Sequence, residues 1–432
     1  MPSIAKRLVA VAVTVLSLLI VLVLVLELTG APRSTGAGPS SSPSVSVAPS
    51  SPASGSPGVV PSPSGSQDVQ AVFAQIQQQV EQLRGLAPAG IGPAEVIGRA
   101  QLEKELADQF EQDYPKARQD ADNLTLRALG LLKPDQDVAK LQLQLLQGQV
   151  IGFYDDKQKR MVVVSEAGVN AEAKITYAHE YTHALQDHAF GLAKLGLDQQ
   201  GEDDQAMARL ALVEGDATYS MLLWARQHLS VQELLGVAGT PQPDMSGIPA
   251  WMLQQLLFSY NEGYTFISAL TAEVGGSFAD VDAAFRDRPP ASTEQVIHPQ
   301  KYAANERPME LAHPDPASAL GAGWKNVEST TLGEAMIGIT LQALGVPASD
   351  ATAAAADWGG DELTVASGPS GGFALAWRLK WDSAAAAARF ASAYASGQSG
   401  LAFPSRLMSV GPQEQLVVHA SSQATLDKLA AG

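Results

Sequence analysis

Residues 177–188 read Tyr-Ala-His-Glu-Tyr-Thr-His-Ala-Leu-Gln-Asp-His, and this stretch decides which fold we expect. His179 and His183 are four residues apart, so on an α-helix with about 100° per residue their imidazoles leave the same face one turn apart. Two imidazoles in that arrangement can bind one metal ion. Glu180 projects to the side of that face, where it can hold a water on the metal without being a ligand itself. The spacing therefore predicts a helix that binds a metal and carries a proton-transfer group.

The opposite face of this helix is apolar, with Tyr177, Tyr181, Ala184 and Leu185 at helical spacing. We therefore expect one face that packs into the core and one chemical face. Histidine is scarce, with 7 in 432 residues, and three of these fall between 179 and 188. The alternative to a metal site is an ordinary amphipathic helix with two exposed histidines.

A catalytic zinc ion usually has three protein ligands and one open position, so a third ligand is needed. The best candidate is Glu214, on a helix expected from about residue 204 to 227. It is the only charge in an apolar stripe made of Met207, Leu210, Ala211, Ala217, Met221 and Ala225. A lone buried carboxylate is costly unless it is paired or bound to a metal. We expect Gly215 to let this helix approach the histidine helix closely. The alternative is a salt bridge from Glu214 to Arg or Lys on another element.

The His-Glu-x-x-His helix followed by a glutamate on a second helix resembles the gluzincin branch of the zincin metallopeptidases. Residues 178–188 and 212–217 are also similar to a poorly characterised group of bacterial membrane-anchored proteins with this motif. The resemblance implies that His179, His183 and Glu214 are zinc ligands and that Glu180 is the catalytic base.

The chain departs from the best-known gluzincins in two ways. The gap of 31 residues from His183 to Glu214 is somewhat long, and Thr218 stands four positions after the glutamate, where those proteins have aspartate. The acid that would support the ligands therefore stays unassigned. Asp216 would point away on an ideal helix, and Asp187 is a weak alternative.

Composition limits the partners that we expect. The content of 46% hydrophobic residues is enough for a sizeable core, and the lack of cysteine means that the fold depends on packing and possibly a metal. The formal net charge is −17, and residues 1–67 carry +2, so the remaining residues carry −19. This acidity argues against nucleic acid as a partner.

The amino terminus predicts attachment to a membrane. Residues 8–28 form an apolar stretch long enough to cross a bilayer of about 30 Å, and Lys6 and Arg7 precede it. We therefore expect a cytoplasmic stub and anchor in residues 1–30, with the globular part outside the cell membrane. A cleaved signal peptide is the competing interpretation, although its apolar region is normally about 7–15 residues long. Residues 31–67, rich in Ser, Pro and Gly, predict a disordered linker.

Residues 68–148 show apolar residues at helical spacing, which predicts an amino-terminal helical region beside a catalytic core at 149–310. Residues 150–154 and 160–165 predict a β-hairpin just before the metal helix. The zincin resemblance implies that an exposed strand here pairs with an extended peptide substrate. We expect Asn170 to cap the metal helix.

Residues 249–271 predict another helix, of which one tyrosine could reach the oxyanion of the reaction. Residues 288–302 are similar to a Ser-Thr-Glu-Gln-x-x-His-Pro phrase in the same bacterial group, and Ser292 or Thr293 could cap a short helix there. Zinc-dependent peptide hydrolysis needs a donor that stabilises the tetrahedral oxyanion, and His298 or Tyr302 could supply it. The alternative is that His298 fixes the loop by hydrogen bonding.

Residues 311–432 predict a small α+β unit that packs against the core or orients the substrate. A helix is expected at 332–344 and a tight turn at 358–361. The order that follows is strand 363–366, strand 373–381, helix 383–396, strand 406–410, strand 416–420 and helix 424–430.

These patterns together predict an α+β protein with a zincin-like metallopeptidase core. The expected function is that of a membrane-tethered extracytoplasmic zinc metallopeptidase acting on peptide or protein substrates, with Glu180 as the base and His298 as the candidate oxyanion donor. Two alternatives stay open: a catalytically inactive surface binding or scaffold protein of the same shape, and a zinc hydrolase of non-peptide amides or esters.

Overall fold

The structure is a computed structural model that describes residues 69–149, 152–164, 169–238 and 245–431. The expected anchor and linker, residues 1–67, lie outside these ranges. Within them, none of the helices combines the length and the apolar character needed to cross a membrane.

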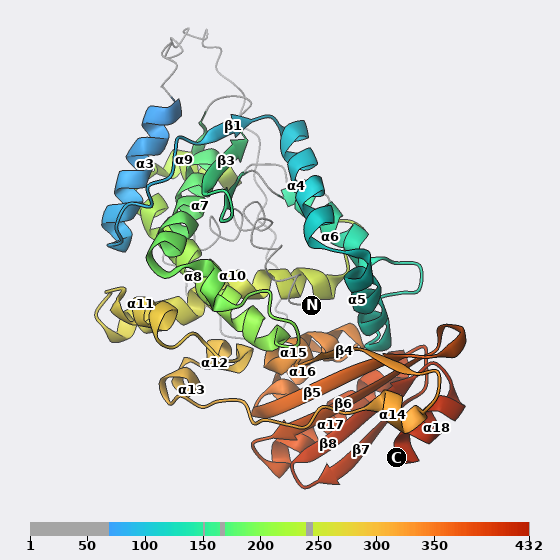
Figure 1. The fold of residues 1–432 in the computed structure, drawn as a ribbon. Coiled ribbons are helices and arrows are strands. Elements are labelled where there is room, and N and C mark those ends of the chain that lie inside the picture. The colour runs from blue at the N-terminus through green and yellow to red at the C-terminus, as the bar shows by residue number, and fades with distance from the viewer. Residues whose placement is uncertain (1–68, 150–151, 165–168, 239–244, 432) are drawn as a thin grey trace, which may run out of the picture.

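The described residues form an α+β fold in which a helical part adjoins an antiparallel sheet (Figure 1). The helical part consists of α3 (Val69–Arg84), β1 (Glu95–Ile97), α4 (Arg99–Asp113), α5 (Lys116–Ala128), α6 (Val138–Gln149), β2 (Gly152–Asp155), β3 (Arg160–Val164), α7 (Ala171–Phe190), α8 (Asp203–His228), α9 (Val231–Ala238), α10 (Ala250–Glu273), α11 (Ala279–Arg286), α12 (Thr293–Ile297) and α13 (Pro299–Ala303). The sheet part consists of α14 (Pro316–Leu320), β4 (Lys325–Thr330), α15 (Gly333–Ala343), α16 (Ala348–Ala355), β5 (Trp358–Ser367), β6 (Phe373–Trp381), α17 (Ala384–Gly397), β7 (Ser405–Gly411), β8 (Glu414–Ala420) and α18 (Gln423–Ala431).

Among the amino-terminal helices, α3 packs beside α7 and α8, whereas α5 packs on strands β4, β5 and β6. The apolar stripe of α3 is buried, and Phe73 on it stacks on Tyr177 of α7 with ring centroids 4.1 Å apart. The expectation that residues 68–148 are helical was wrong at one place, because residues 95–97 form strand β1 before α4 begins. Val96 of this strand pairs in parallel with Val163 of β3.

The predicted hairpin is confirmed as β2 and β3, which pair antiparallel from Gly152↔Val163 to Asp155↔Arg160. The strand order is β1-β3-β2, so β2 lies at an edge of this small sheet. The Asp155 carboxylate accepts the backbone N–H groups of Lys157 and Gln158, at 3.0 and 2.9 Å, and so fixes the turn.

Asn170 caps α7 as predicted, since its side chain accepts the Ala173 N–H at 2.8 Å. The expectation of one core face and one chemical face was too simple. Both faces of α7 are buried from Ile175 to Gln186, because α3, α8 and the hairpin surround the helix. The two histidines therefore lie inside the protein, where an unpaired charge is costly.

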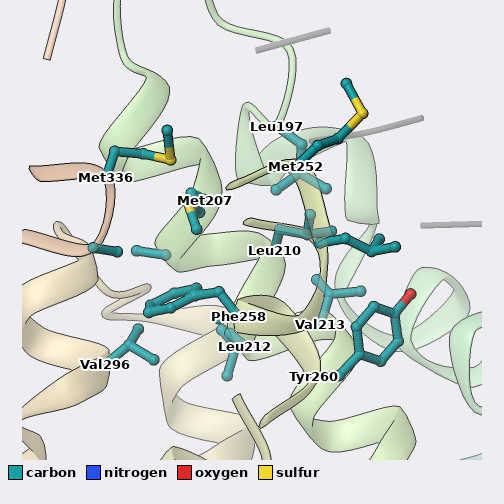
Figure 2. Packing of buried hydrophobic residues seen from close by; sticks show 14 of the residues in the cluster. Leu197, Met207, Leu210, Leu212, Val213, Met252, Phe258, Tyr260, Val296 and Met336 are labelled. Atoms are coloured by element: carbon teal, nitrogen blue, oxygen red, sulfur yellow. The ribbon is translucent and has the colours of Figure 1, made fainter. Parts of the chain in front are cut away.

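The helix that carries Glu214 crosses α10 at very short range. A Cβ atom on Gly215 would lie 2.3 Å from the carbonyl carbon of Gly263, and one on Gly263 would lie 2.3 Å from the Ala211 oxygen. Gly215 thus permits close approach to α10, and the expectation that it serves the contact with the histidine helix was wrong. Met207 and Leu210 of α8 belong to the same buried cluster as Met252 and Phe258 of α10 (Figure 2).

The carboxy-terminal sheet has the strand order β4-β5-β6-β8-β7 in the described residues. Its alternating side chains bury both faces: Leu375, Trp377 and Leu379 face the main core, whereas Ala374 and Ala376 pack with α14 and α18. Two details of the prediction were wrong. Residues 325–330 form an additional strand, β4, and residues 358–361, expected as a tight turn, begin strand β5 with a bulge.

A buried histidine joins this sheet to the amino-terminal helices. His419 of β8 donates its Nδ1–H to the Ala128 carbonyl at 2.7 Å, and its Nε2 accepts the Tyr394 hydroxyl at 2.7 Å. Burial lowers the pKa of His419 to about 4. His419 is therefore neutral near pH 7, so one ring nitrogen donates a hydrogen bond while the other accepts one.

Candidate metal centre

Two adjacent helices bring His179, His183 and Glu214 together as the sequence predicts. The two Nε2 atoms of the histidines are 3.1 Å apart, and Glu214 Oε2 lies 3.2 Å from His179 Nε2 and 3.5 Å from His183 Nε2. The imidazole rings are nearly perpendicular, at 87°. All three residues are at most 2% exposed, so the cluster is buried inside the protein.

The dimensions of this cluster fit a tetrahedral zinc ion. Three donors that each lie about 2.0–2.2 Å from one zinc ion are separated from one another by about 3.3–3.6 Å. The three observed separations are close to this range. The second oxygen of Glu214 has no hydrogen-bond partner among the described residues, and the ion pairs of Glu214 there are with the two histidines. The structure thus does not show the alternative, a salt bridge from Glu214 to Arg or Lys. A cation between the three groups would neutralise the buried Glu214 carboxylate.

The electrostatics of the three groups are coupled. Burial opposes a charge on His183, but the adjacent Glu214 carboxylate outweighs it and raises the pKa of His183 to about 9. Burial lowers the pKa of His179. Burial alone would raise the pKa of Glu214, yet the two histidines bring it below its usual value. The buried site thus stabilises the Glu214 carboxylate together with a proton on His183. A metal ion could replace this proton as the positive charge.

A chain of hydrogen bonds fixes the orientation of His183. Gln186 uses its Nε2 to donate to Asp216 at 2.9 Å and to the Val213 carbonyl at 3.0 Å, so its Oε1 is the atom that faces His183 Nδ1 at 2.9 Å. His183 therefore donates from Nδ1, and Nε2 is directed at the cluster. Asp216 in turn accepts from Arg84 of α3 at 2.8 Å.

These hydrogen bonds identify Asp216 as the supporting acid that could not be assigned from the sequence. Asp216 acts through Gln186, one turn after His183, so it does not need to face the histidines directly. Asp187 has other partners: it accepts the Tyr154 hydroxyl at 2.9 Å and the Lys159 ammonium group. Gln186 and Arg84 were not singled out from the sequence, since Arg84 is 132 residues from Asp216 and glutamine has no charge pattern.

Glu180 lies beside the cluster, and one of its oxygens is held in place. The backbone N–H of Tyr154 in the edge strand β2 donates to Glu180 Oε2 at 2.9 Å, while Oε1 has no partner among the described residues. Burial raises the pKa of Glu180 to about 8, and the Glu214 carboxylate adds to this effect. The carboxyl group is therefore oriented but retains a free oxygen for proton transfer.

Glu180 and His183 line a cavity of about 420 Å³. Strand β2 contributes Phe153 and Tyr154, and the amino-terminal helices contribute the opposite wall. Helix α7 thus borders a pocket large enough for a ligand.

The two candidate oxyanion donors have other partners. His298 Nε2 lies 3.0 Å from Glu334 Oε1 of α15, and this contact raises the pKa of His298. The Tyr302 hydroxyl donates to the Arg288 carbonyl at 2.8 Å. Neither residue lines the cavity. Ser292 caps α12 as predicted, because its side chain accepts the Gln295 N–H. On α10, the ring of Tyr260 lies 6.2 Å from that of His179.

A second group of acids, Glu294, Glu306 and Asp382, also has the spacing of metal ligands. The Lys301 ammonium group lies 2.7 Å from a carboxylate oxygen of each of these three residues. Lysine therefore supplies the positive charge there, and this group is explained as an ion-pair network between α12, α13 and the strand β6 region.

Comparison with known proteins adds little beyond this geometry. Residues 319–403 match a family described as a domain of unknown function, DUF8575. No curated protein matches the sequence. One solved structure, a chain from Chloroflexus aurantiacus described as a candidate hydrolase with a novel fold, shares 16% identity and a TM-score of 0.35 over 55% of this chain and 88% of its own. Similarity at that level supports no conclusion about fold or function.

Proposed function

We propose that this protein is a zinc-dependent metallopeptidase with a zincin-like core, tethered to the outer face of a membrane by its amino terminus. The observation that carries this proposal is the buried triangle of His179, His183 and Glu214, with donor separations of 3.1–3.5 Å, next to a carboxyl group that faces a cavity. His179, His183 and Glu214 would hold the ion. When bound, zinc would supply Lewis-acid activation of a water molecule and of the scissile carbonyl.

Glu180 performs the proton transfers in this proposal. It takes the proton from the attacking water through its unpartnered oxygen and passes it to the leaving amine. The Tyr154 N–H holds the other oxygen, so the carboxyl group keeps one orientation during both transfers. A cation on the three ligands would favour the ionised form of Glu180 that accepts a proton.

The edge position of β2 supports an extended peptide as the substrate. Strands at an edge offer unpaired backbone groups, and an added strand makes hydrogen bonds without requiring a particular side-chain sequence. In the described residues β2 pairs with β3 alone, so its other side has no strand partner. The Tyr154 N–H already donates to Glu180, so a substrate strand would use the other backbone groups of that edge.

Metal analysis of the purified full-length protein in detergent tests this proposal, together with hydrolysis of a mixed peptide library. We expect about one zinc ion per chain in the wild type and in Glu180→Gln, and loss of zinc in Glu214→Ala. Glu180→Gln should lose hydrolysis by 10²-fold or more, because general acid–base catalysis contributes about 10²–10⁴-fold. Undiminished hydrolysis in a zinc-loaded Glu180→Gln protein would refute the assignment, and so would a wild type that binds no zinc when it is supplied.

A further inference from the structure

The first described helix, α3, begins at the end of the helical part that carries α9. Helix α3 runs antiparallel to α8, because Arg84 in its last turn donates to Asp216, whereas Gln79 accepts the Trp224 Nε1–H at 2.8 Å. Lower residue numbers of α3 thus lie beside higher residue numbers of α8. The first turn of α3 therefore lies near the end of α8, where α9 follows, and residues 1–68 join the described fold at this end.

Strand β1 belongs to the same end of the molecule. The Gln70 side chain in the first turn of α3 donates to the Ala94 carbonyl at 2.9 Å, directly before β1. Lys174 in the first turn of α7 contacts Glu233 of α9 at 2.9 Å. Figure 1 shows β1 and α9 at the end of the helical part that is remote from the carboxy-terminal sheet. These two elements therefore share the surface at which the amino-terminal segment enters the fold.

Exposed large apolar side chains gather at this end. Among the described residues, five such side chains are strongly exposed: Val96, Val231, Leu235, Met309 and Val410. The first three belong to β1 and α9. Val231 and Leu235 are one turn apart on α9 and are 60% and 55% exposed, so they point from the same face of the helix. Single exposed apolar residues are common, whereas apolar residues that gather at one place indicate a contact surface.

Helix α9 carries no unpaired charge. Glu233 is its only charged residue, and it accepts hydrogen bonds from the Ser230 N–H and from the Lys174 ammonium group, both at 2.9 Å. Leu234 and Val237 are buried and pack the helix against the protein. The exposed face can therefore enter an apolar phase without the cost of removing water from an unpaired charge.

We infer that α9 and β1 form a surface that contacts a lipid bilayer, with Val231, Leu235 and Val96 inserted at the boundary between headgroups and acyl chains. The inference rests on the proposed membrane tether and is independent of peptidase activity. The predicted linker, residues 31–67, has a root-mean-square length of about 30–40 Å. It joins the fold at this end, so the bilayer is the apolar partner that the tether always keeps close to α9 and β1.

Docking by this surface would limit the distance between the bilayer and the cavity beside Glu180. Helix α4 begins at Arg99, directly after β1, and Asp113 at its other end lines the cavity. The helix has 15 residues and is therefore about 22 Å long. The cavity would be held within about 22 Å of the lipid-contacting surface, whereas a flexible linker alone would leave its direction free.

Site-specific fluorescence tests the contact in the full-length protein. The chain has no cysteine, so Leu235→Cys provides one site for the environment-sensitive dye NBD. The labelled protein is reconstituted in phosphatidylcholine vesicles, with and without lipid that carries a nitroxide near the headgroup. We expect a blue-shifted emission and about twofold or greater quenching by the nitroxide lipid, because the label would lie about 5–10 Å deep. Adding Val231→Glu, which places a charge on the same face, should abolish both effects.

Val410→Cys is the matched control. Val410 lies in β7 of the carboxy-terminal sheet and is 52% exposed, close to the 55% of Leu235. Its label should show neither the blue shift nor the quenching. Equal quenching of the two labels would overturn the inference. A blue shift at residue 235 without quenching by nitroxide lipid would also overturn it, because that result indicates a protein partner such as a second copy.

Flotation of the same vesicles separates this inference from the tether proposal. The wild type and both labelled proteins should float with the lipid, and loss of the zinc site should not change this result. A protein that floats but shows no quenching at residue 235 refutes the lipid-contacting surface and leaves the tether intact. A protein that does not float refutes the tether and this inference with it.

Discussion

Replacing Gly263 with alanine tests whether the close crossing of α8 and α10 positions the metal site. In Gly263→Ala the new Cβ atom would lie 2.3 Å from the Ala211 oxygen and 3.0 Å from the Gly215 Cα. Ordinary contacts are about 3.4 Å or longer, so α10 would have to move by about 1 Å, against packing that is as dense as an organic crystal.

The two opposing contributions can be estimated. Inserting a methyl group into a packed core costs about 1–3 kcal/mol and occasionally more. Alanine is about 1 kcal/mol better than glycine inside a helix, which offsets part of that cost. Because the overlap is about 1 Å, we expect a cost near the upper end, about 3 kcal/mol, and so a net destabilisation of about 2 kcal/mol, seen as a lower urea midpoint. We also expect weaker zinc binding, because Glu214 directly precedes Gly215 at this crossing.

Gly236→Ala is the control for helix propensity. Gly236 lies in α9, and no atom lies within 4 Å of the position its Cβ would take. This variant should be more stable than the wild type, by about 0.5–1 kcal/mol. The two substitutions are chemically identical but should shift the urea midpoint in opposite directions. A Gly263→Ala protein as stable as Gly236→Ala would show that the close crossing is not as described.

Two further predictions concern the site and a buried acid pair. Gln186→Leu removes the link between His183 and Asp216, so zinc affinity measured by competition with a chelator should fall about 10–100-fold. Asp187→Asn should leave it unchanged, since Asp187 contacts Tyr154 and Lys159 instead, and equal losses in both variants would contradict the proposed relay. Burial raises the pKa of both Glu328 and Asp203 to about 7. Between about pH 4.5 and 7 the unfolded chain releases these protons while the folded protein retains them, so stability should fall as pH rises through this window and level off above it. Glu328→Gln should make the fall in urea-unfolding free energy shallower by up to about 3 kcal/mol, and an identical pH profile would refute this.

Local sequence patterns were sufficient to predict that His179, His183 and Glu214 lie together. His179 and His183 share one helix, and Glu214 stands out as a charge in an apolar stripe, so their proximity follows from periodicity and the cost of burying a charge. The hydrogen bonds that link His183 through Gln186 and Asp216 to Arg84 do not follow from periodicity, because they require the relative placement of three helices. No pattern within one helix contains that information.

The missed strands have a similar explanation. Strand β1 has three residues, and its partner β3 is more than 60 residues away, so nothing local distinguishes it from the start of α4. Residues 358–361 contain a Gly-Gly pair, which is typical of turns. In the structure these glycines lie in a strand, and a Cβ on Gly360 would lie 2.5 Å from the Met309 oxygen, so the pair permits another segment to approach.

The order of strands in the carboxy-terminal sheet determines where the chain can be divided. The segment that matches DUF8575 ends at residue 403, before β7 and β8, although β8 hydrogen-bonds along β6 from Ala374↔Ala420 to Lys380↔Glu414. A fragment cut at that boundary would expose β6 as a new edge, a template for pairing with other chains. It would also lose His419, whose Nε2 accepts the hydroxyl of the buried Tyr394. A gene fragment intended for separate expression, or exchanged between proteins as a module, should therefore extend through α18.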